Sequence, residues 1–202
     1  MKSLVLATNN THKIKEFKGL FKSSAFNIIV PKKNEEMPKV KETGSTFHNN
    51  AFLKAKAFSD KLKNKYWVLS DDSGLEVDIL NGEPGVLSAR YAGENASDQD
   101  NINKLLFNLN KFNKKRFSAR FKCVICIIDK KQSVYYFEGI CEGNVALECS
   151  GKNGFGYDPI FFPKNYSKTF AQLGEQIKSK LSHRAIATKN CNNFFKDLNA
   201  TF

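Results

Sequence analysis

The sequence has few cysteines, few arginines and no long hydrophobic run. Its five Cys are an odd number spread over 202 residues, too sparse for a disulfide framework. No secretory signal precedes them, because the apolar run Leu4–Ala7 is only four residues long. The longest apolar run, Cys123–Ile128, is far short of the ~20 residues that a membrane-spanning helix needs. We therefore expect a soluble, cytoplasmic protein with reduced thiols.

The basic residues are almost all lysine. The formal net charge is +12, and 28 of the 32 basic residues are Lys. Such a surplus is compatible with a nucleic-acid partner, but Arg, which reads guanine edges with two hydrogen bonds, numbers only four. The acid-free stretch from Asn101 to Ile128 is interpreted as a solvated loop and strand face. We expect neither a nucleic-acid nor a membrane partner, and a basic nucleic-acid-binding module stays the alternative.

Strand and helix periodicities are mixed along the chain, and the 41% of hydrophobic residues suffices for a continuous core. The segment 31–44 is predicted to be a charged loop, and Gly143-Asn144 a turn. The mixture predicts one α/β domain over residues 1–202 with a sheet of mixed direction, flanked by helices. Strands are predicted at Ser3–Ala7, Phe26–Val30, Tyr66–Ser70, Leu75–Leu80, Phe117–Ile127, Ser133–Gly139 and Asn144–Cys149, and helices from Thr11 or His12, Phe47, Ser97 and Ala187.

The first candidate site is the polar segment between the first strand and the first helix. Backbone N–H groups at a helix start, small polar side chains and one Lys are typical of a phosphate-binding loop. The Gly-Lys-Ser/Thr ending of a Walker loop is absent. The alternative is an ordinary turn that caps the helix. The segment consists of Thr8, Asn9, Asn10, Thr11, His12 and Lys13.

The second candidate is Ser70–Gly74, which directly follows an apolar strand. Adjacent carboxylates at such a step point in different directions, so one can face a site while the other supports it. Carboxylate oxygens suit Mg²⁺, which takes one or two of them together with phosphate oxygens. The alternative is an Asp-rich turn on the surface.

Two further candidates lie in the second half. In Gly151–Pro159 the glycines allow close approach, and Phe155 and Tyr157 offer rings for stacking on a base. Lys178 and the segment Ser182–Arg184 supply donors for carbonyl or phosphate oxygens. The alternatives are a loop anchored by its aromatic rings and a capped helix.

Cys123 and Cys126 have the spacing of a redox or zinc motif, but they lie inside an apolar strand without a second pair. We interpret them as buried structural thiols.

Together these motifs resemble the inosine triphosphate pyrophosphatase family, the RdgB-like enzymes. The resemblance implies an elongated mixed sheet with two lobes around a nucleotide-binding cleft, and a homodimer. It also implies Mg²⁺-dependent hydrolysis of ITP, dITP and XTP to the monophosphate and pyrophosphate, which cleanses the nucleotide pool. It covers nearly the whole chain, through Leu4–Lys13, Glu42–Gly44, Ser70–Gly74, Pro84-Gly85, Ser88–Tyr91, Gly154–Phe162, Lys178 and Ser182–Arg184.

The resemblance further implies a role for each matched residue. Asp72 would bind Mg²⁺ and accept the proton of the attacking water, and Glu42 would be the second metal carboxylate. Ser73 would contact the substrate. The triphosphate would be held by Thr8, Asn9, Asn10, Thr11, His12, Lys13 and Lys54, and the base by Phe155, Gly156, Tyr157, Asp158, Lys178, His183 and Arg184.

Four positions depart from the family pattern: Asn9 stands where Gly is common, Asn49 and Gln172 replace Glu, and Lys152-Asn153 replace small residues. Asn tolerates left-handed backbone angles, so Asn9 is expected to keep the loop geometry. Asn49 removes a charge near the proposed metal.

Overall fold

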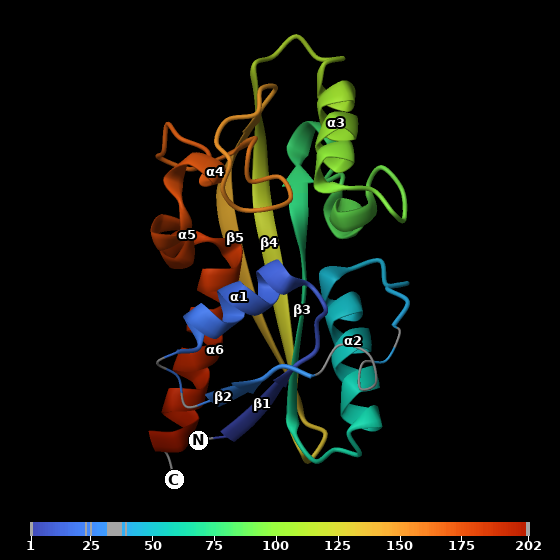
Figure 1. Ribbon diagram of the computed structural model, residues 1–202, viewed down its shortest axis with the longest axis vertical. Helices are drawn as coiled ribbons and strands as arrows, with labels where there is room; N and C mark the ends of the chain where they lie inside the picture. Colours follow the sequence, from blue (N-terminus) through green and yellow to red (C-terminus); the bar gives the residue numbers. More distant parts are fainter. Residues whose placement is uncertain (1, 23, 25, 32–37, 39, 201–202) are drawn as a thin grey trace. The chain divides into compact units, whose positions relative to one another are not determined.

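The computed structural model describes residues 2–22, 24, 26–31, 38 and 40–200, and these form a sheet with helices around it (Figure 1). The six strands lie in the order β2-β1-β3-β4-β5-β6. Strand β1 is parallel to β2 and to β3, whereas β6 is antiparallel to β5, so the predicted mixed sheet is confirmed. The strands are β1 (Lys2–Leu6), β2 (Phe26–Ile29), β3 (Trp67–Val77), β4 (Arg116–Ile128), β5 (Val134–Ala146) and β6 (Phe161–Pro163).

The predicted helix starts are confirmed at Thr11, Phe47 and Ser97, where Ser97 caps the helix in a reciprocal pair with Asp100. No helix within the described part of the chain is long and apolar enough to cross a membrane. The helices are α1 (Thr11–Leu20), α2 (Phe47–Lys61), α3 (Asp98–Leu109), α4 (Phe170–Leu173), α5 (Glu175–Leu181) and α6 (His183–Ala200), with 3₁₀ turns η1 (Asp78–Leu80) and η2 (Gly85–Arg90).

The predicted charged loop over 31–44 lies partly outside the described residues, because residues 32–37 and 39 do not belong to them. Residues 40–44 have neither helix nor strand structure, as expected for a loop.

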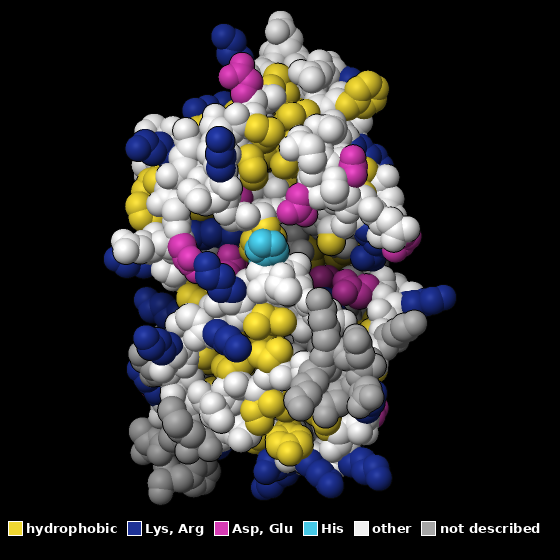
Figure 2. All heavy atoms as spheres, in the orientation of Figure 1, with side chains coloured by type: hydrophobic (Ala, Val, Ile, Leu, Met, Phe, Trp, Pro, Cys, Tyr) yellow, Lys and Arg dark blue, Asp and Glu magenta, His cyan; other side chains and the backbone are white. Residues whose placement is uncertain are grey.

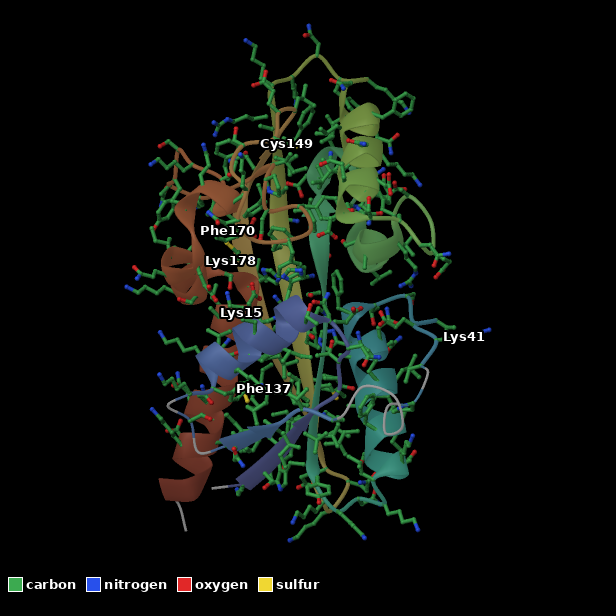
Figure 3. The ribbon with its side chains drawn as sticks, viewed as in Figure 1. Lys15, Lys41, Phe137, Cys149, Phe170 and Lys178 are labelled. Atoms are coloured by element: carbon green, nitrogen blue, oxygen red, sulfur yellow. The ribbon has the colours of Figure 1, made fainter. Side chains whose placement is uncertain are left out.

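The chain forms two compact units, each with its own hydrophobic core. The first comprises Met1–Asp72, Cys123–Gly139 and Arg184–Phe202, and the second Ser73–Lys122 and Ile140–His183. In the first core, side chains of β1, β3 and β4 pack with α1 and α6, and Phe137 (Figure 3) closes it from β5. In the second core, α3 and α4 pack with β3, β4, β5 and β6. Two units agree with the expected lobes, whereas a cleft around a nucleotide stays a prediction.

The predicted turn at Gly143-Asn144 is wrong, and so is the alternative of a surface turn at Ser70–Gly74, because both segments lie inside strands. Strand β3 runs without a break through Ser70–Gly74, and β5 runs through Gly143-Asn144. Gly143 serves close packing: a Cβ there would lie 2.2 Å from the carbonyl oxygen of Phe162 in β6. The glycine therefore marks a place where two backbones approach each other, not a change of chain direction.

Candidate active site

The adjacent residues Asp71 and Asp72 lie on opposite faces of β3, because side chains alternate along a strand. Leu69 packs into the core that α1 and α6 cover, and the hydroxyl of Ser70 donates to the carbonyl of Ala51 in α2. Because side chains alternate along a strand, Asp71 follows Leu69 and Asp72 follows Ser70. The prediction that the two carboxylates point in different directions is confirmed: Asp71 faces α1 and α6, and Asp72 faces α2.

On the α1 and α6 face, Asp71 binds two cations. Its Oδ2 atom lies 2.9 Å from Lys13 Nζ and 3.2 Å from Arg184 Nη2. Arg184 Nη1 donates to Glu16, and the Arg184 residue is only 1% exposed. Burial favours a raised pKa for Asp71, but the charges of Lys13 and Arg184 outweigh it and hold the pKa well below its usual range. Asp71 is therefore a permanent anion that positions Lys13.

On the α2 face, both oxygens of Asp72 are held. Oδ1 lies 3.3 Å from Lys54 Nζ, and Oδ2 accepts from Asn50 Nδ2 at 3.1 Å. Burial raises the pKa of Asp72, Lys54 and Lys13 oppose the rise, and Glu42 adds to it. A carboxylate with a raised pKa is a better proton acceptor than an ordinary aspartate. The two neighbours in sequence thus differ in chemistry: Asp71 is a fixed anion, and Asp72 is suited to take a proton.

Glu42 and Asp72 converge on one cation. Lys54 Nζ lies 3.1 Å from Glu42 Oε1 as well as 3.3 Å from Asp72 Oδ1. Burial disfavours the ammonium, yet the carboxylates of Asp72, Asp71 and Glu42 raise the pKa of Lys54. Among the described residues, no three His, Cys, Asp or Glu side chains are placed to hold a metal. A carboxylate pair fits Mg²⁺, which takes its remaining ligands from phosphate and water.

The segment before α1 is a helix cap in this structure. Asn10 Oδ1 accepts from the backbone N–H groups of His12 at 2.9 Å and Lys13 at 3.1 Å, and Thr8 Oγ1 accepts from the Asn10 N–H at 3.2 Å. Asn9 does not have a positive φ, so its tolerance of left-handed backbone angles is not used here. The capping turn is confirmed, and phosphate binding by Thr8–Lys13 stays a prediction.

In the second unit, Asp158 organises the predicted base-binding residues. Its Oδ2 atom lies 2.6 Å from Lys178 Nζ and accepts from the Phe155 N–H at 2.9 Å. The Lys178 ammonium lies 4.4 Å from the centre of the Phe155 ring and 5.8 Å from that of Phe170, labelled beside it in Figure 3. A Cβ at Gly154, where φ is +83°, would meet Asp158 Oδ2 at 2.0 Å. Asp158 therefore fixes the backbone of the loop at Phe155 and also the position of the Lys178 ammonium.

The expectation that the Tyr157 ring stacks on a base is contradicted by its burial. The residue is 4% exposed, belongs to the second core, and donates from its hydroxyl to the Ser88 carbonyl at 2.9 Å. The neighbouring Gly156 N–H donates to Asp98. His183, also buried, stacks on Phe121 with ring centres 4.8 Å apart.

The structure brings most predicted residues into two groups, one in each unit. The first group consists of Lys13, Glu42, Lys54, Asp72 and Arg184, with Thr8, Asn9, Asn10, Thr11 and His12 at the start of α1, and the second of Phe155, Gly156, Tyr157, Asp158, Lys178 and His183. Ser73 follows Asp72 in β3 and is half-buried. Arg184 was expected with the base-binding residues, but its described hydrogen bonds go to Asp71 and Glu16 in the first unit. Sequence reasoning missed Asn50, although it lies four residues before Lys54 on a predicted helix.

The model of the Ham1 family matches residues 4–194 of this chain. The chain belongs to the Ham1 family. A dITP/XTP pyrophosphatase of Staphylococcus epidermidis is 47% identical over 93% of this chain and 93% of its own. One of Halalkalibacterium halodurans is 42% identical over 94% and 96%. These relatives confirm the resemblance drawn from the motifs.

Solved Ham1 structures support the same fold. The Ham1 protein of Staphylococcus aureus matches with a TM-score of 0.84 and 44% identity over 97% of this chain and 99% of its own. A Ham1 protein from Coxiella burnetii matches with a TM-score of 0.86 and 36% identity over 98% and 100%.

Two departures from the Ham1 pattern, Gln172 and Asn153, form hydrogen bonds of their own. The Gln172 side chain accepts from the Thr169 N–H at 2.9 Å, so it completes a capping box as Glu does elsewhere. Asn153 Nδ2 donates to the Ala171 carbonyl at 3.0 Å. Asn49 is exposed in the first turn of α2.

The Cys123 and Cys126 thiols are buried, as predicted, and burial raises the pKa of each to about 12. Such thiols are protonated at neutral pH and are poor nucleophiles.

We expect Arg184→Met to destabilise the fold by about 3 kcal/mol or more, because it removes one partner of a buried ion pair and leaves Glu16 and Asp71 short of positive charge. Arg120→Met is the matched control, since Arg120 pairs with Asp78 and Glu142 at a partly exposed site and such pairs contribute at most about 1 kcal/mol. Urea denaturation measures both variants. Equal losses would contradict the importance of the buried pair.

Proposed function

We propose that this chain is a Mg²⁺-dependent pyrophosphatase that hydrolyses ITP, dITP and XTP to the monophosphate and pyrophosphate. The observation that carries the proposal is the buried Asp72, whose pKa is raised and which converges with Glu42 on Lys54. The curated relatives named dITP/XTP pyrophosphatase support the substrate class. Hydrolysis of these nucleotides keeps them out of DNA and RNA.

The chain's own residues supply the parts of an attack by water on the α-phosphorus. Asp72 accepts the proton of the water, which the raised pKa of its carboxyl favours. Lys13 and Lys54 offer positive charge to the phosphate oxygens as pyrophosphate leaves. Mg²⁺, held by Glu42 and Asp72, supplies further charge neutralisation when bound.

The remaining roles follow the family resemblance. The residues from Thr8 to Lys13 hold the triphosphate and Ser73 contacts the substrate. The chain acts as a homodimer, which sedimentation equilibrium tests. The base is held by residues of the second unit: Phe155, Gly156, Asp158, Lys178 and His183.

A panel of nucleoside triphosphates tests the proposal. Incubation of the protein with ITP, dITP, XTP, ATP and GTP, with and without Mg²⁺, is followed by assays of pyrophosphate and orthophosphate. We expect pyrophosphate from the first three substrates, no orthophosphate, and loss of activity when EDTA removes the metal. Release of orthophosphate would show attack at the γ-phosphorus and contradict the proposal.

A basic nucleic-acid-binding module is the rival function. It would bind DNA or RNA with a steep dependence on salt and would not need Asp72. On the face shown in Figure 2, Lys and Arg side chains of the described residues lie at the margins and also within the face. The buried, cation-paired arrangement around Asp72 favours the enzyme.

Lys13→Ala is expected to weaken triphosphate hydrolysis and inhibition by pyrophosphate together, because one ammonium meets the same oxygens in both ligands. Lys18→Ala, at an exposed position on the same helix, is the control and should change neither. The measurements are kcat/KM for ITP and the inhibition constant of pyrophosphate. Unchanged pyrophosphate inhibition in Lys13→Ala would show that Lys13 does not bind the leaving group.

A further inference from the structure

Asn50 joins the two segments that carry the carboxylates. It is fully buried in the first turn of α2. Its Oδ1 atom accepts from the Gly44 N–H at 2.8 Å, and its Nδ2 atom donates to Asp72 Oδ2 at 3.1 Å. A backbone N–H only donates and a carboxylate oxygen accepts, so the two partners fix which end of the amide is which. The side chain thus has one orientation and two assigned hydrogen bonds.

Asn50 and Lys54 hold Asp72 as a pair. They are four residues apart on α2, so they lie on the same face of the helix. Asn50 binds Oδ2, whereas Lys54 binds Oδ1 and also reaches Glu42. Gly44 follows Glu42 by two residues, so the amide that holds Asp72 also holds the backbone next to Glu42. The distance between the two carboxylates therefore depends on Asn50 as well as on Lys54.

Gly44 is shaped to receive the amide. A Cβ at this position would lie 2.7 Å from Asn50 Oδ1 and 2.7 Å from Asn49 Cβ, closer than side-chain atoms pack. Since the φ of Gly44 is not in the left-handed region, the glycine is explained by this approach and not by backbone conformation.

We propose that Asn50 is a positioning residue of the hydrolytic site, a role that rests on the proposed function. Its neutral donor fixes Oδ2 and leaves Oδ1 as the oxygen that meets cations and water. A neutral amide adds no charge to the site, and its hydrogen bond to Asp72 is separate from the contact that Lys54 makes with Oδ1. Through Gly44 it also sets the position of the backbone next to Glu42, so it holds in place the two carboxylates that would bind Mg²⁺.

The test compares Asn50→Ala and Gly44→Ala with Asn103→Ala. Asn50→Ala removes both hydrogen bonds, whereas Gly44→Ala keeps every functional side chain and only displaces the amide. Asn103→Ala is the control, because it makes the same substitution at an exposed position of α3. For each variant, kcat and KM for ITP and the Mg²⁺ concentration for half-maximal activity are measured, and circular dichroism checks the fold.

Loss of a residue that orients metal ligands costs about 10- to 100-fold in activity or metal affinity. We expect kcat to fall by about this factor in Asn50→Ala and in Gly44→Ala, and the half-saturating Mg²⁺ concentration to rise. KM for ITP should change little, because the predicted phosphate loop is a different segment, and Asn103→Ala should match the unsubstituted protein. A merely structural role would lower stability without this split between kcat and KM.

Unchanged kcat and Mg²⁺ dependence in a folded Asn50→Ala would overturn the inference. If that variant does not fold, an unchanged kcat in Gly44→Ala would overturn it instead. If the unsubstituted protein releases no pyrophosphate from ITP, dITP or XTP, the proposed function fails and the inference fails with it. An active protein with unaffected variants contradicts the inference alone.

Discussion

Asp72→Asn is expected to keep the fold and to lower the turnover of ITP by at least about 10²-fold, the scale of losing a general base. The substitution keeps the shape of the side chain, and the amide can still accept from Asn50. It removes the proton acceptor, and it also removes one of the two carboxylates that converge on Lys54. Single-turnover measurement of pyrophosphate release at saturating ITP and Mg²⁺ isolates the chemical step.

Asp71→Asn is the matched control for this prediction, because the two residues are neighbours on opposite faces of β3. Asp71 supports Lys13 and Arg184, so its loss should lower stability and weaken phosphate binding while turnover falls less than in Asp72→Asn. Equal turnover of the unsubstituted protein and Asp72→Asn would refute the assignment of Asp72 as the proton acceptor. A larger loss of turnover in Asp71→Asn would exchange the two roles.

The regular elements could be predicted from the sequence where one face of an element is buried and the other is solvated. Strand β4 alternates Phe117, Ala119 and Phe121 with polar residues, and the alternation survives in the structure because the apolar side chains fill the second core. Helix α3 begins where Ser97 and Asp100 predict it. In both cases local pattern and tertiary environment agree.

Strand β3 could not be predicted in full, because its polar centre is buried against charges from distant parts of the chain. Two consecutive aspartates favour a surface turn unless cations meet them. Here Lys13 and Arg184 come from α1 and α6, and Lys54 comes from α2. Such pairing depends on three-dimensional contact and leaves no periodicity in the sequence. The short helices α4 and α5 contain too few residues to show a helical period.

In the candidate site, too, some features could be predicted from the sequence and others depend on three-dimensional contacts. Family motifs identify Asp72, Glu42 and Lys54, and the structure adds which atoms meet. The roles of Asn50 and Gly44 depend on one hydrogen bond across a loop, which residue type alone does not indicate. Tyr157 shows the opposite error, since an aromatic ring in a glycine-rich loop was expected to face a ligand but fills the core.

The choice of purine base is expected to have a second large effect on activity, besides that of Asp72. We expect kcat/KM for ITP and XTP to exceed that for ATP strongly, with about 10⁴-fold as the upper end. The 6-oxo group of hypoxanthine and xanthine accepts hydrogen bonds, whereas the 6-amino group of adenine donates them. The Lys178 ammonium, which lies 2.6 Å from Asp158, can only donate hydrogen bonds. Adenine would therefore place its 6-amino donor opposite a buried ammonium donor, and neither group can accept a hydrogen bond from the other. The penalty falls on the substrate that lacks the matching acceptor.

His183→Ala separates base recognition from general damage to the fold. His183 lies in the unit that also contains Lys178 and is proposed to donate to the 6-oxo group, so its loss should lower kcat/KM for ITP much more than the residual value for ATP. His48→Ala is the control, because His48 is a partly exposed histidine that pairs with Glu138 in the other unit. A loss of stability alone would reduce the fraction of active protein, and the apparent kcat/KM for ITP and for ATP would fall by the same factor. Equal kcat/KM for ITP and ATP in the unsubstituted protein would refute the selection argument, since donors that discriminate must produce a difference before any residue is replaced.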